Sequence, residues 1–182
     1  MCLILFNYVK FRYVLLLKSV SPLRLYKHKV FWLRFANRPF AMTELDEYEK
    51  HFTVMNYEEG AELKQIHDED FVEMFEQQYG AEHAWEGLDK KVGDMLKECF
   101  ESACSLPPPR GMTHSAQARA VYAVDFMLKW NGDKTEMIPQ ILEINFNPDT
   151  QRACKYHPDF YNDCLKALFF DDLDGLPVSR IA

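Results

Sequence analysis

One long amphipathic segment, Trp85 to Cys104, constrains the fold of this chain more than any other feature. Its apolar residues recur at intervals of three and four positions, so on a helix they form a single stripe. The members of the stripe are Leu88, Val92, Met95, Leu96, Cys99, Phe100 and Ala103. Three consecutive prolines, residues 107–109, cannot continue a helix and therefore end it. The sequence predicts one long helix with one apolar face.

Four further segments read as strands. Residues 9–17 and 29–36 are rich in Val, Leu, Tyr and Phe, and each run ends at turn-forming residues, which predicts two neighbouring strands. Residues 120–130 and 138–146 predict two more, and apolar spacing predicts helices over residues 68–78 and 160–169. Strands and helices do not alternate regularly. We therefore expect an α+β fold, an antiparallel sheet flanked by helices on one side.

The charge of the chain is unevenly distributed. The 182 residues carry a formal net charge of −7, which argues against general nucleic-acid binding. Residues 1–43, here called the basic section, hold eight basic side chains and no acidic one. The rest has thirteen basic against twenty-eight acidic side chains, a net charge of −15. This split predicts a basic surface that faces an anionic partner.

The five cysteines and the first residues indicate a cytoplasmic protein. The number of cysteines is odd and no pair has Cys-x-x-Cys spacing, so neither a disulfide framework nor a structural zinc site is expected. Lys10 and Arg12 interrupt the apolar start of the chain, which leaves no run of the ~20 residues that a membrane span needs. We expect no membrane segment and no signal peptide.

Three oxygen-bearing side chains on two predicted strands are candidate metal ligands. Glu143 and Asn145 stand two positions apart, so they share one face of their strand. Asp125 lies among apolar residues on the preceding strand, where an ionised carboxylate needs a partner. Two carboxylates and an amide suit Mg²⁺, with phosphate oxygens as further ligands. Lys10 and Arg12 would supply positive charge for the phosphates.

The register of these two strands decides whether the three ligands can meet. Asp125 lies opposite Glu143 only if the strands are antiparallel and Trp130 pairs with Ile138, which leaves residues 131–137 as a loop. A tight turn at residues 131–132 would place Asp125 opposite Ile138 instead. The polar composition of the loop and Pro139, which cannot donate a ladder hydrogen bond, favour the longer connection.

Ordinary structural roles for the same residues stay open from the sequence. Asp125 could cap a helix or pair with Arg119 in a purely structural ion pair. Lys10 and Arg12 could be edge-strand charges that oppose aggregation of the sheet.

Several segments resemble the tubulin–tyrosine ligase-like family, whose fold is ATP-grasp. They are VFWLRFANRPFA, YEKHFTVMNY, YAVDFMLKW, PQILEINFNPD and RACKYHPDFYND, within a match over residues 10–168. The resemblance implies that Asp125, Glu143 and Asn145 are magnesium ligands. It further implies that Lys10, Arg12 and Thr53 contact ATP and that Arg12, which resembles the end of a Phe-Asp-x-Arg motif, is catalytic. Active relatives use ATP to form an acyl phosphate, which an amino group attacks, and their substrate is the acidic C-terminal tail of tubulin.

The chain departs from the family pattern at three places. Val9-Lys10-Phe11-Arg12 lacks the Asp of the motif, and Val54 stands where active relatives have the Asn of His-Leu-Thr-Asn. The resemblance also begins within the domain, so we expect residues 1–182 to be the C-terminal part of an incomplete ATP-grasp domain, with residues 1–9 of uncertain origin. The upstream half of such a domain would then be an expected binding partner of this chain.

Two functional hypotheses follow from the resemblance and its departures. The first is a non-catalytic protein, a pseudoenzyme by family, that binds tubulin or microtubules in the cytoplasm and regulates tubulin modification. The alternative is an ATP- and Mg²⁺-dependent ligase that adds an amino acid to the acidic tail of tubulin. As given, the chain is expected to bind ATP and Mg²⁺ weakly and to be inactive alone.

Overall fold

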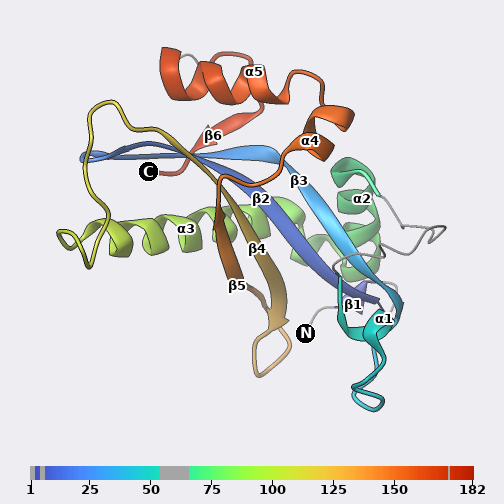
Figure 1. Cartoon of the computed structure of the whole chain (residues 1–182). Coiled ribbons are helices and arrows are strands. Elements are labelled where there is room, and N and C mark those ends of the chain that lie inside the picture. Colours follow the sequence, from blue (N-terminus) through green and yellow to red (C-terminus); the bar gives the residue numbers. More distant parts are fainter. Residues whose placement is uncertain (1–2, 5–6, 54–65, 172) are drawn as a thin grey trace. The chain divides into compact units, whose positions relative to one another are not determined.

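The computed structural model describes residues 3–4, 7–53, 66–171 and 173–182 (Figure 1). Its strands are β1 (Leu3–Ile4), β2 (Asn7–Val20), β3 (Leu23–Pro39), β4 (Ala120–Trp130), β5 (Met137–Phe146) and β6 (Val178–Arg180). Its helices are α1 (Tyr48–His51), α2 (Asp68–Tyr79), α3 (Trp85–Cys104), α4 (Gln151–Tyr156) and α5 (Phe160–Leu165), with a 3₁₀ turn η1 (Ala81–His83) and a π-helical turn η2 (Lys166–Phe170).

The six strands form one sheet. The strand order is β5-β4-β2-β3-β6. The short strand β1 is outside this order and pairs with β2 in antiparallel orientation. β6 is antiparallel to β3, with Lys27 opposite Ser179. The predicted α+β class is confirmed, as are the neighbouring positions of the first two long strands and of the last two predicted strands.

The chain divides into two compact units, and each takes three separate stretches of sequence. The first unit consists of Met1–Arg12, Phe31–Asp89 and Asp125–Leu142. The second consists of Tyr13–Val30, Lys90–Val124 and Glu143–Ala182.

Aromatic rings build the core of the first unit. Phe11 of β2 stacks on Phe126 of β4 with 5.1 Å between ring centroids, and Phe31 of β3 stacks on Trp85 of α3 at 5.0 Å. Phe71 of α2 meets Trp85 edge to face at 5.4 Å. Such pairs add about 0.5–1.5 kcal/mol each beyond the burial of their area. Phe11 of β2 thereby packs against α2 and the start of α3.

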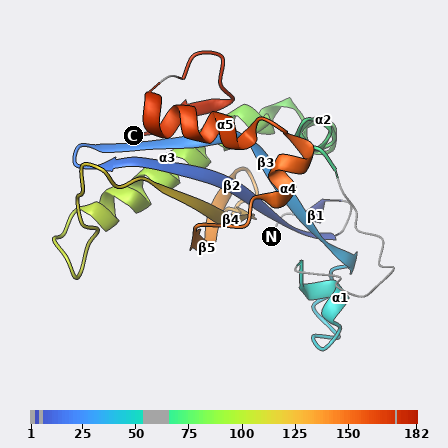
Figure 2. The same cartoon turned by 45° about the horizontal axis from the view of Figure 1, so that its top comes forward.

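Helices cover both faces of the strands in the second unit, so the expectation of helices on one side is wrong there. α3 lies on one face of β2 and β3 and α5 on the other (Figures 1 and 2). His28 of β3 contacts Phe160 of α5 with ring centroids 4.7 Å apart. Because both faces are covered, Val14, Leu15 and Leu16 are at most 2% exposed although successive side chains of a strand point to opposite sides.

Two of the long elements have the predicted bounds, whereas β3 begins six residues before and ends three residues after the predicted range of 29–36. α3 and β4 have the predicted bounds, and α2 ends one residue later than expected. Gly80 follows α2 with a φ of 87°, a conformation that glycine adopts without strain. Among the described residues, no helix is long and apolar enough to span a lipid bilayer.

Candidate functional site

The alternation of β2 separates its apolar residues from its basic ones. Phe11 points into the aromatic core of the first unit, so Lys10 and Arg12 point to the opposite face of the strand. Both belong to the first unit, as does Asp125 of β4, the strand beside β2.

Asp125, Lys10 and Arg12 form a tightly bound group, here called the Asp125 cluster. Asp125 is fully buried. Arg12 donates from Nε to Oδ1 at 2.5 Å and from Nη2 to Oδ2 at 2.7 Å, a bidentate arrangement. The Nζ atom of Lys10 lies 2.6 Å from Oδ2. Both carboxylate oxygens therefore contact a cation.

Two positive charges surround one negative charge in this cluster. Lys10 is 8% exposed and the Arg12 side chain 17% exposed, so water screens these charges poorly. Removing one partner of such a buried group costs about 3–5 kcal/mol, because the remaining charge stays buried without compensation. The cluster is thus held in place by its own charges.

Arg119 does not take part in this cluster, so the alternative pairing of Asp125 with Arg119 is wrong. Arg119 donates from Nε to the carbonyl oxygen of Leu168 at 3.0 Å, and from Nη1 to the carbonyls of Ala116 and Ala118. The bond from Nε joins the loop before β4 to η2, and the two bonds from Nη1 stay within that loop.

The other two candidate metal ligands lie on β5 in the second unit. Glu143 is exposed and Asn145 half-buried. They share a face of the strand, as predicted from their spacing. Their approach to Asp125, which belongs to the first unit, stays a prediction.

One hydrogen bond at the end of β5 has the offset of the predicted register. The backbone N–H of Asn147 donates to the carbonyl oxygen of Val121 at 2.9 Å. Pairs Val121–Asn147 and Asp125–Glu143 belong to one antiparallel register, because a step forward on one strand is a step back on the other. The loop between β4 and β5 covers residues 131–136, one fewer than expected, and the Asn131 N–H donates to the Glu136 carbonyl at 2.9 Å. This pairing is one residue off the predicted register, so the register at Asp125 stays a prediction.

The last predicted nucleotide contact, Thr53, is half-buried just after α1. α1 belongs to the first unit, and its His51 ring packs edge to face on Phe40 at 5.3 Å. Val54, the departure from the family's Asn, lies outside the described residues.

The residues present do not fit a bare Mg²⁺ ion at Asp125. Its oxygens already contact Arg12 and Lys10 at 2.5–2.7 Å, so a dication would stand beside two cations. In the part of the chain that the structure describes, no group of three His, Cys, Asp or Glu residues could hold a metal.

The region of the chain that resembles known proteins includes the residues of this candidate site. The model of the tubulin-tyrosine ligase family matches residues 3–179, nearly the whole chain. The chain belongs to the tubulin-tyrosine ligase family. The matched residues include the Asp125 cluster, Thr53, Glu143 and Asn145.

Curated relatives of this family share much of the sequence. "Tubulin--tyrosine ligase-like protein 12" of Mus musculus is 51% identical over 178 residues, which is 95% of this chain and 28% of that protein. The protein of the same name from Homo sapiens is 52% identical over 176 residues, and that from Caenorhabditis elegans 37% identical over 177. The chain thus spans roughly a quarter of the length of these relatives, between 26% and 28%.

This member of the tubulin-tyrosine ligase family contains a second ion cluster that the sequence did not predict. Asp171 follows η2 in a left-handed conformation, with a φ of 57°. Lys18 lies 2.7 Å from its carboxylate, Arg24 3.3 Å, and the Tyr26 hydroxyl donates to it at 3.0 Å. The hydrogen bond from Lys18 is the main cause that lowers the pKa of Asp171. Alternation along β3 places Arg24 and Tyr26 on one face, which is the only sequence signal for this cluster.

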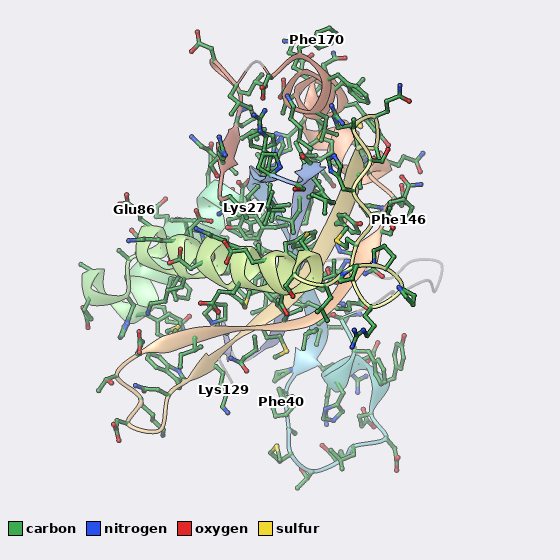
Figure 3. The ribbon with its side chains drawn as sticks, turned by 90° about the vertical axis from the view of Figure 1, so that its left-hand side faces the viewer. Lys27, Phe40, Glu86, Lys129, Phe146 and Phe170 are labelled. Carbon is green, nitrogen blue, oxygen red and sulfur yellow. The ribbon has the colours of Figure 1, made fainter. Side chains whose placement is uncertain are left out.

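Most of the basic section is therefore not a free surface, contrary to expectation. Asp125 and Asp171 bind four of its eight basic side chains. Lys27 is 2% exposed, with Nζ 4.5 Å from the centre of the Tyr13 ring, and Figure 3 shows it surrounded by other side chains. Arg38 is exposed but binds Glu47 and Glu49 at 3.1 and 2.7 Å. Lys29 is the exposed lysine of β3.

Proposed function

We propose that the chain is a non-catalytic member of its family, which binds the acidic C-terminal tail of tubulin in the cytoplasm and regulates tubulin modification. The observation that carries the proposal is the Asp125 cluster. The carboxylate expected to bind the metal of an ATP site is bound by Arg12 and Lys10, at 2.5–2.7 Å and out of contact with water.

Lys10 supports this proposal through its position in the sequence motif. It stands where the resemblance leads one to expect an aspartate, two positions before Arg12. An aspartate there would repel Asp125 unless a metal ion lay between them, whereas the ammonium group of Lys10 attracts it. With lysine in place of aspartate at position 10, the side chain itself supplies the positive charge that a bound cation would otherwise have to supply.

The alternative function is ATP- and Mg²⁺-dependent ligation of an amino acid to the tubulin tail, on an ATP-grasp domain. The bond between Asn147 and Val121 favours it, because the same register would bring Glu143 and Asn145 toward Asp125. In that function Asp125, Glu143 and Asn145 would hold the metal, and Lys10, Arg12 and Thr53 would contact the nucleotide.

Lys29 is the residue through which we expect the basic section to attract an acidic tail. It is exposed, whereas the other lysines of β2 and β3 are buried or bound to carboxylates. A contact of this kind weakens as salt is added, because dissolved ions screen the charges. The screening length is about 10 Å at 0.1 M ionic strength.

One experiment on the purified chain separates the two functions. Binding to a fluorescent Glu-rich tail peptide is measured at low and high salt, and incorporation of a labelled amino acid into tubulin is measured with Mg·ATP. We expect salt-sensitive binding without incorporation, and Lys29→Glu should weaken binding about threefold to tenfold. Lys129→Glu, the same change at an exposed lysine of β4, is the control. Incorporation that Glu143→Gln abolishes would establish the ligase, and salt-independent binding would contradict the electrostatic contact.

A further inference from the structure

The second ion cluster, here called the Asp171 cluster, combines donors from the sheet with a carboxylate from another element. Lys18 of β2 and Arg24 and Tyr26 of β3 stand on neighbouring strands, whereas Asp171 follows η2 at the end of the C-terminal helical run, which consists of α5 and η2. All four residues belong to the second unit. The sheet therefore positions the three donors, and Asp171 reaches them from a separate segment.

The three donors converge on the Asp171 carboxylate. Nζ of Lys18 lies 2.7 Å from Oδ1, the Tyr26 hydroxyl donates to the same oxygen at 3.0 Å, and Nη1 of Arg24 donates to Oδ2 at 3.3 Å. Lys18 and Tyr26 are 7% and 2% exposed, so the surrounding side chains hold them in place. Burial and the hydrogen bond to Asp171 raise the pKa of Tyr26, so its hydroxyl keeps its proton at neutral pH. Two cations and a neutral hydroxyl form a receptor for a carboxylate.

The carboxylate in this receptor can exchange with one from solution. The Asp171 side chain is 51% exposed and that of Arg24 is 40% exposed, so an anion can approach both from water. Ion pairs at such positions are weak, because water solvates the separated charges and salt screens them. The charge of Arg180 acts on the pKa of Tyr26 in the same sense as that of Arg24, which places a third cation near the receptor.

We propose that Lys18, Arg24 and Tyr26 bind the carboxylates of an acidic peptide, and that Asp171 occupies their place when no peptide is bound. The receptor already holds the carboxylate of a polypeptide side chain, which is the chemistry that a Glu-rich segment offers. Such a segment supplies several carboxylates in succession, whereas Asp171 supplies one. The inference rests on the proposed binding of an acidic tubulin tail and gives that tail a second site, on the same strand as Lys29.

A purely structural ion cluster makes a different prediction. If Asp171 only fastens the helical run to the sheet, removing its charge lowers the stability of the chain and leaves the binding of acidic peptides unchanged. If Asp171 competes with the peptide, the same change strengthens binding, because the receptor loses its internal ligand. The direction of the change in affinity therefore separates the two roles.

The test measures binding of fluorescent hexaglutamate to the purified chain by anisotropy at low ionic strength. Hexaglutamate carries the acidic side chains of a tail without its other residues. We expect Asp171→Asn to bind it about threefold to fivefold more tightly than the unchanged chain, and high salt to remove this gain. Asp159→Asn, which removes the same charge from the exposed N-cap of α5, is the control and should change the affinity less than about twofold.

Two donor variants assign the gain to the receptor. Arg24→Gln or Tyr26→Phe, each combined with Asp171→Asn, should remove most of the gain, because each takes away one donor and keeps most of the side-chain volume. A gain that survives both changes would place the peptide elsewhere. Equal binding by Asp171→Asn and the unchanged chain, an equal gain in Asp159→Asn, or no binding by any variant would overturn the proposal.

Arg24→Gln in the otherwise unchanged chain covers the case in which Asp171→Asn does not fold. It should weaken the binding of hexaglutamate about threefold, and unchanged binding would overturn the proposal. Because hexaglutamate is not tubulin, failure with this peptide leaves tail binding through Lys29 standing. Absence of tubulin binding, with the expected gain for hexaglutamate, would contradict the proposed function and leave the receptor standing.

Discussion

Asp125 and Asp171 each take two basic side chains from the first part of the chain. Asp125 is fully buried between Lys10 and Arg12, whereas the Asp171 side chain is half exposed beside Lys18 and Arg24. A buried carboxylate depends on its partners far more than an exposed one, because water replaces lost contacts only at the surface. We therefore expect the Asp125 cluster to contribute more to the free energy of unfolding than the Asp171 cluster, although the two have similar composition.

The first prediction concerns Asp125 itself. Asp125→Ala should lower the free energy of unfolding by about 3–5 kcal/mol, because it removes the buried carboxylate that Lys10 and Arg12 both contact. Urea unfolding followed by circular dichroism measures the loss. Asp171→Ala, which removes a carboxylate with the same number of cationic partners at an exposed position, should cost clearly less. Equal losses in the two variants would contradict the difference in burial.

The second prediction concerns the pH dependence that His28 introduces. His28 is 1% exposed, its Nδ1 accepts the Val30 N–H at 3.2 Å, and no partner for its Nε2 is found among the described residues. Burial, followed by the nearby His157, lowers the pKa of His28 from 6.5 to about 4. Since the folded pKa lies below the unfolded one, the stabilisation is present above pH 6.5 and is lost as the pH falls toward 4.

Unfolding free energies between about pH 7 and pH 4 test this assignment. The chain should lose about 3 kcal/mol over this range through His28, and His28→Leu should lose correspondingly less. His114→Gln, at an exposed position before β4, should keep the slope of the unchanged chain. An unchanged slope in His28→Leu would show that other groups cause the pH dependence.

Sequence reasoning at the residue scale succeeded where one strand sufficed and failed where two elements had to be placed. Asp125 among apolar neighbours implied that its carboxylate needs a partner, but the sequence suggested Mg²⁺ or Arg119 for it and assigned Lys10 and Arg12 to phosphates, whereas the structure pairs these two cations with Asp125. That Lys27 is buried could not be seen, because its position on a face covered by other elements depends on how β2, β3 and the helices pack. Asp171 lies beyond the last predicted helix, so its partners on β2 and β3 were not accessible to spacing arguments.

At the scale of elements, the C-terminal helical run has one buried face and one exposed face. Phe160, Cys164, Ala167 and Leu168 are at most 3% exposed, whereas Tyr161, Leu165, Phe169 and Phe170 are 46–76% exposed. Figure 3 shows the Phe170 side chain extending away from its helix. The buried face holds α5 and η2 on the sheet of the second unit.

Two phenylalanines of this run give a matched prediction. Phe160→Ala should lower the free energy of unfolding by about 3–5 kcal/mol, because it leaves a cavity against His28. Phe169→Ala makes the same chemical change at a side chain that is 57% exposed and should stay within about 0.5 kcal/mol of the unchanged chain. Thermal unfolding of both variants measures the contrast, and similar losses would mean that the two faces are misassigned.

Strong periodicity made the long elements predictable, and short elements lacked it. α3 and β4 were placed at their observed bounds because each carries a pattern over many residues. α4 with six residues and β6 with three carry too few positions for either period to show. The uninterrupted apolar run at residues 14–17 is typical of a strand that is covered on both faces. The prediction of helices on one side of the sheet did not take this run into account.

At the scale of the whole molecule, each unit consists of three separate stretches, so no single cut in the chain separates one unit from the other. The exposed loop of residues 131–136 offers a place to test this. A chain cleaved there should stay together through size-exclusion chromatography, because the second unit takes residues from both fragments. Denaturant should then separate them. Fragments that elute apart under native conditions would show that the units are held more loosely than their composition implies.

The pairing of β6 with β3 joins residues about 150 positions apart in the sequence, since Lys27 lies opposite Ser179. The Leu25 N–H donates to the Ala182 carbonyl at 3.2 Å, and the Lys29 N–H to that of Pro177 at 2.7 Å. A ribosome that adds 5–20 residues per second needs on the order of ten seconds to make the intervening chain. During that interval the nascent protein presents an unsatisfied row of backbone groups, to which another copy emerging nearby can pair.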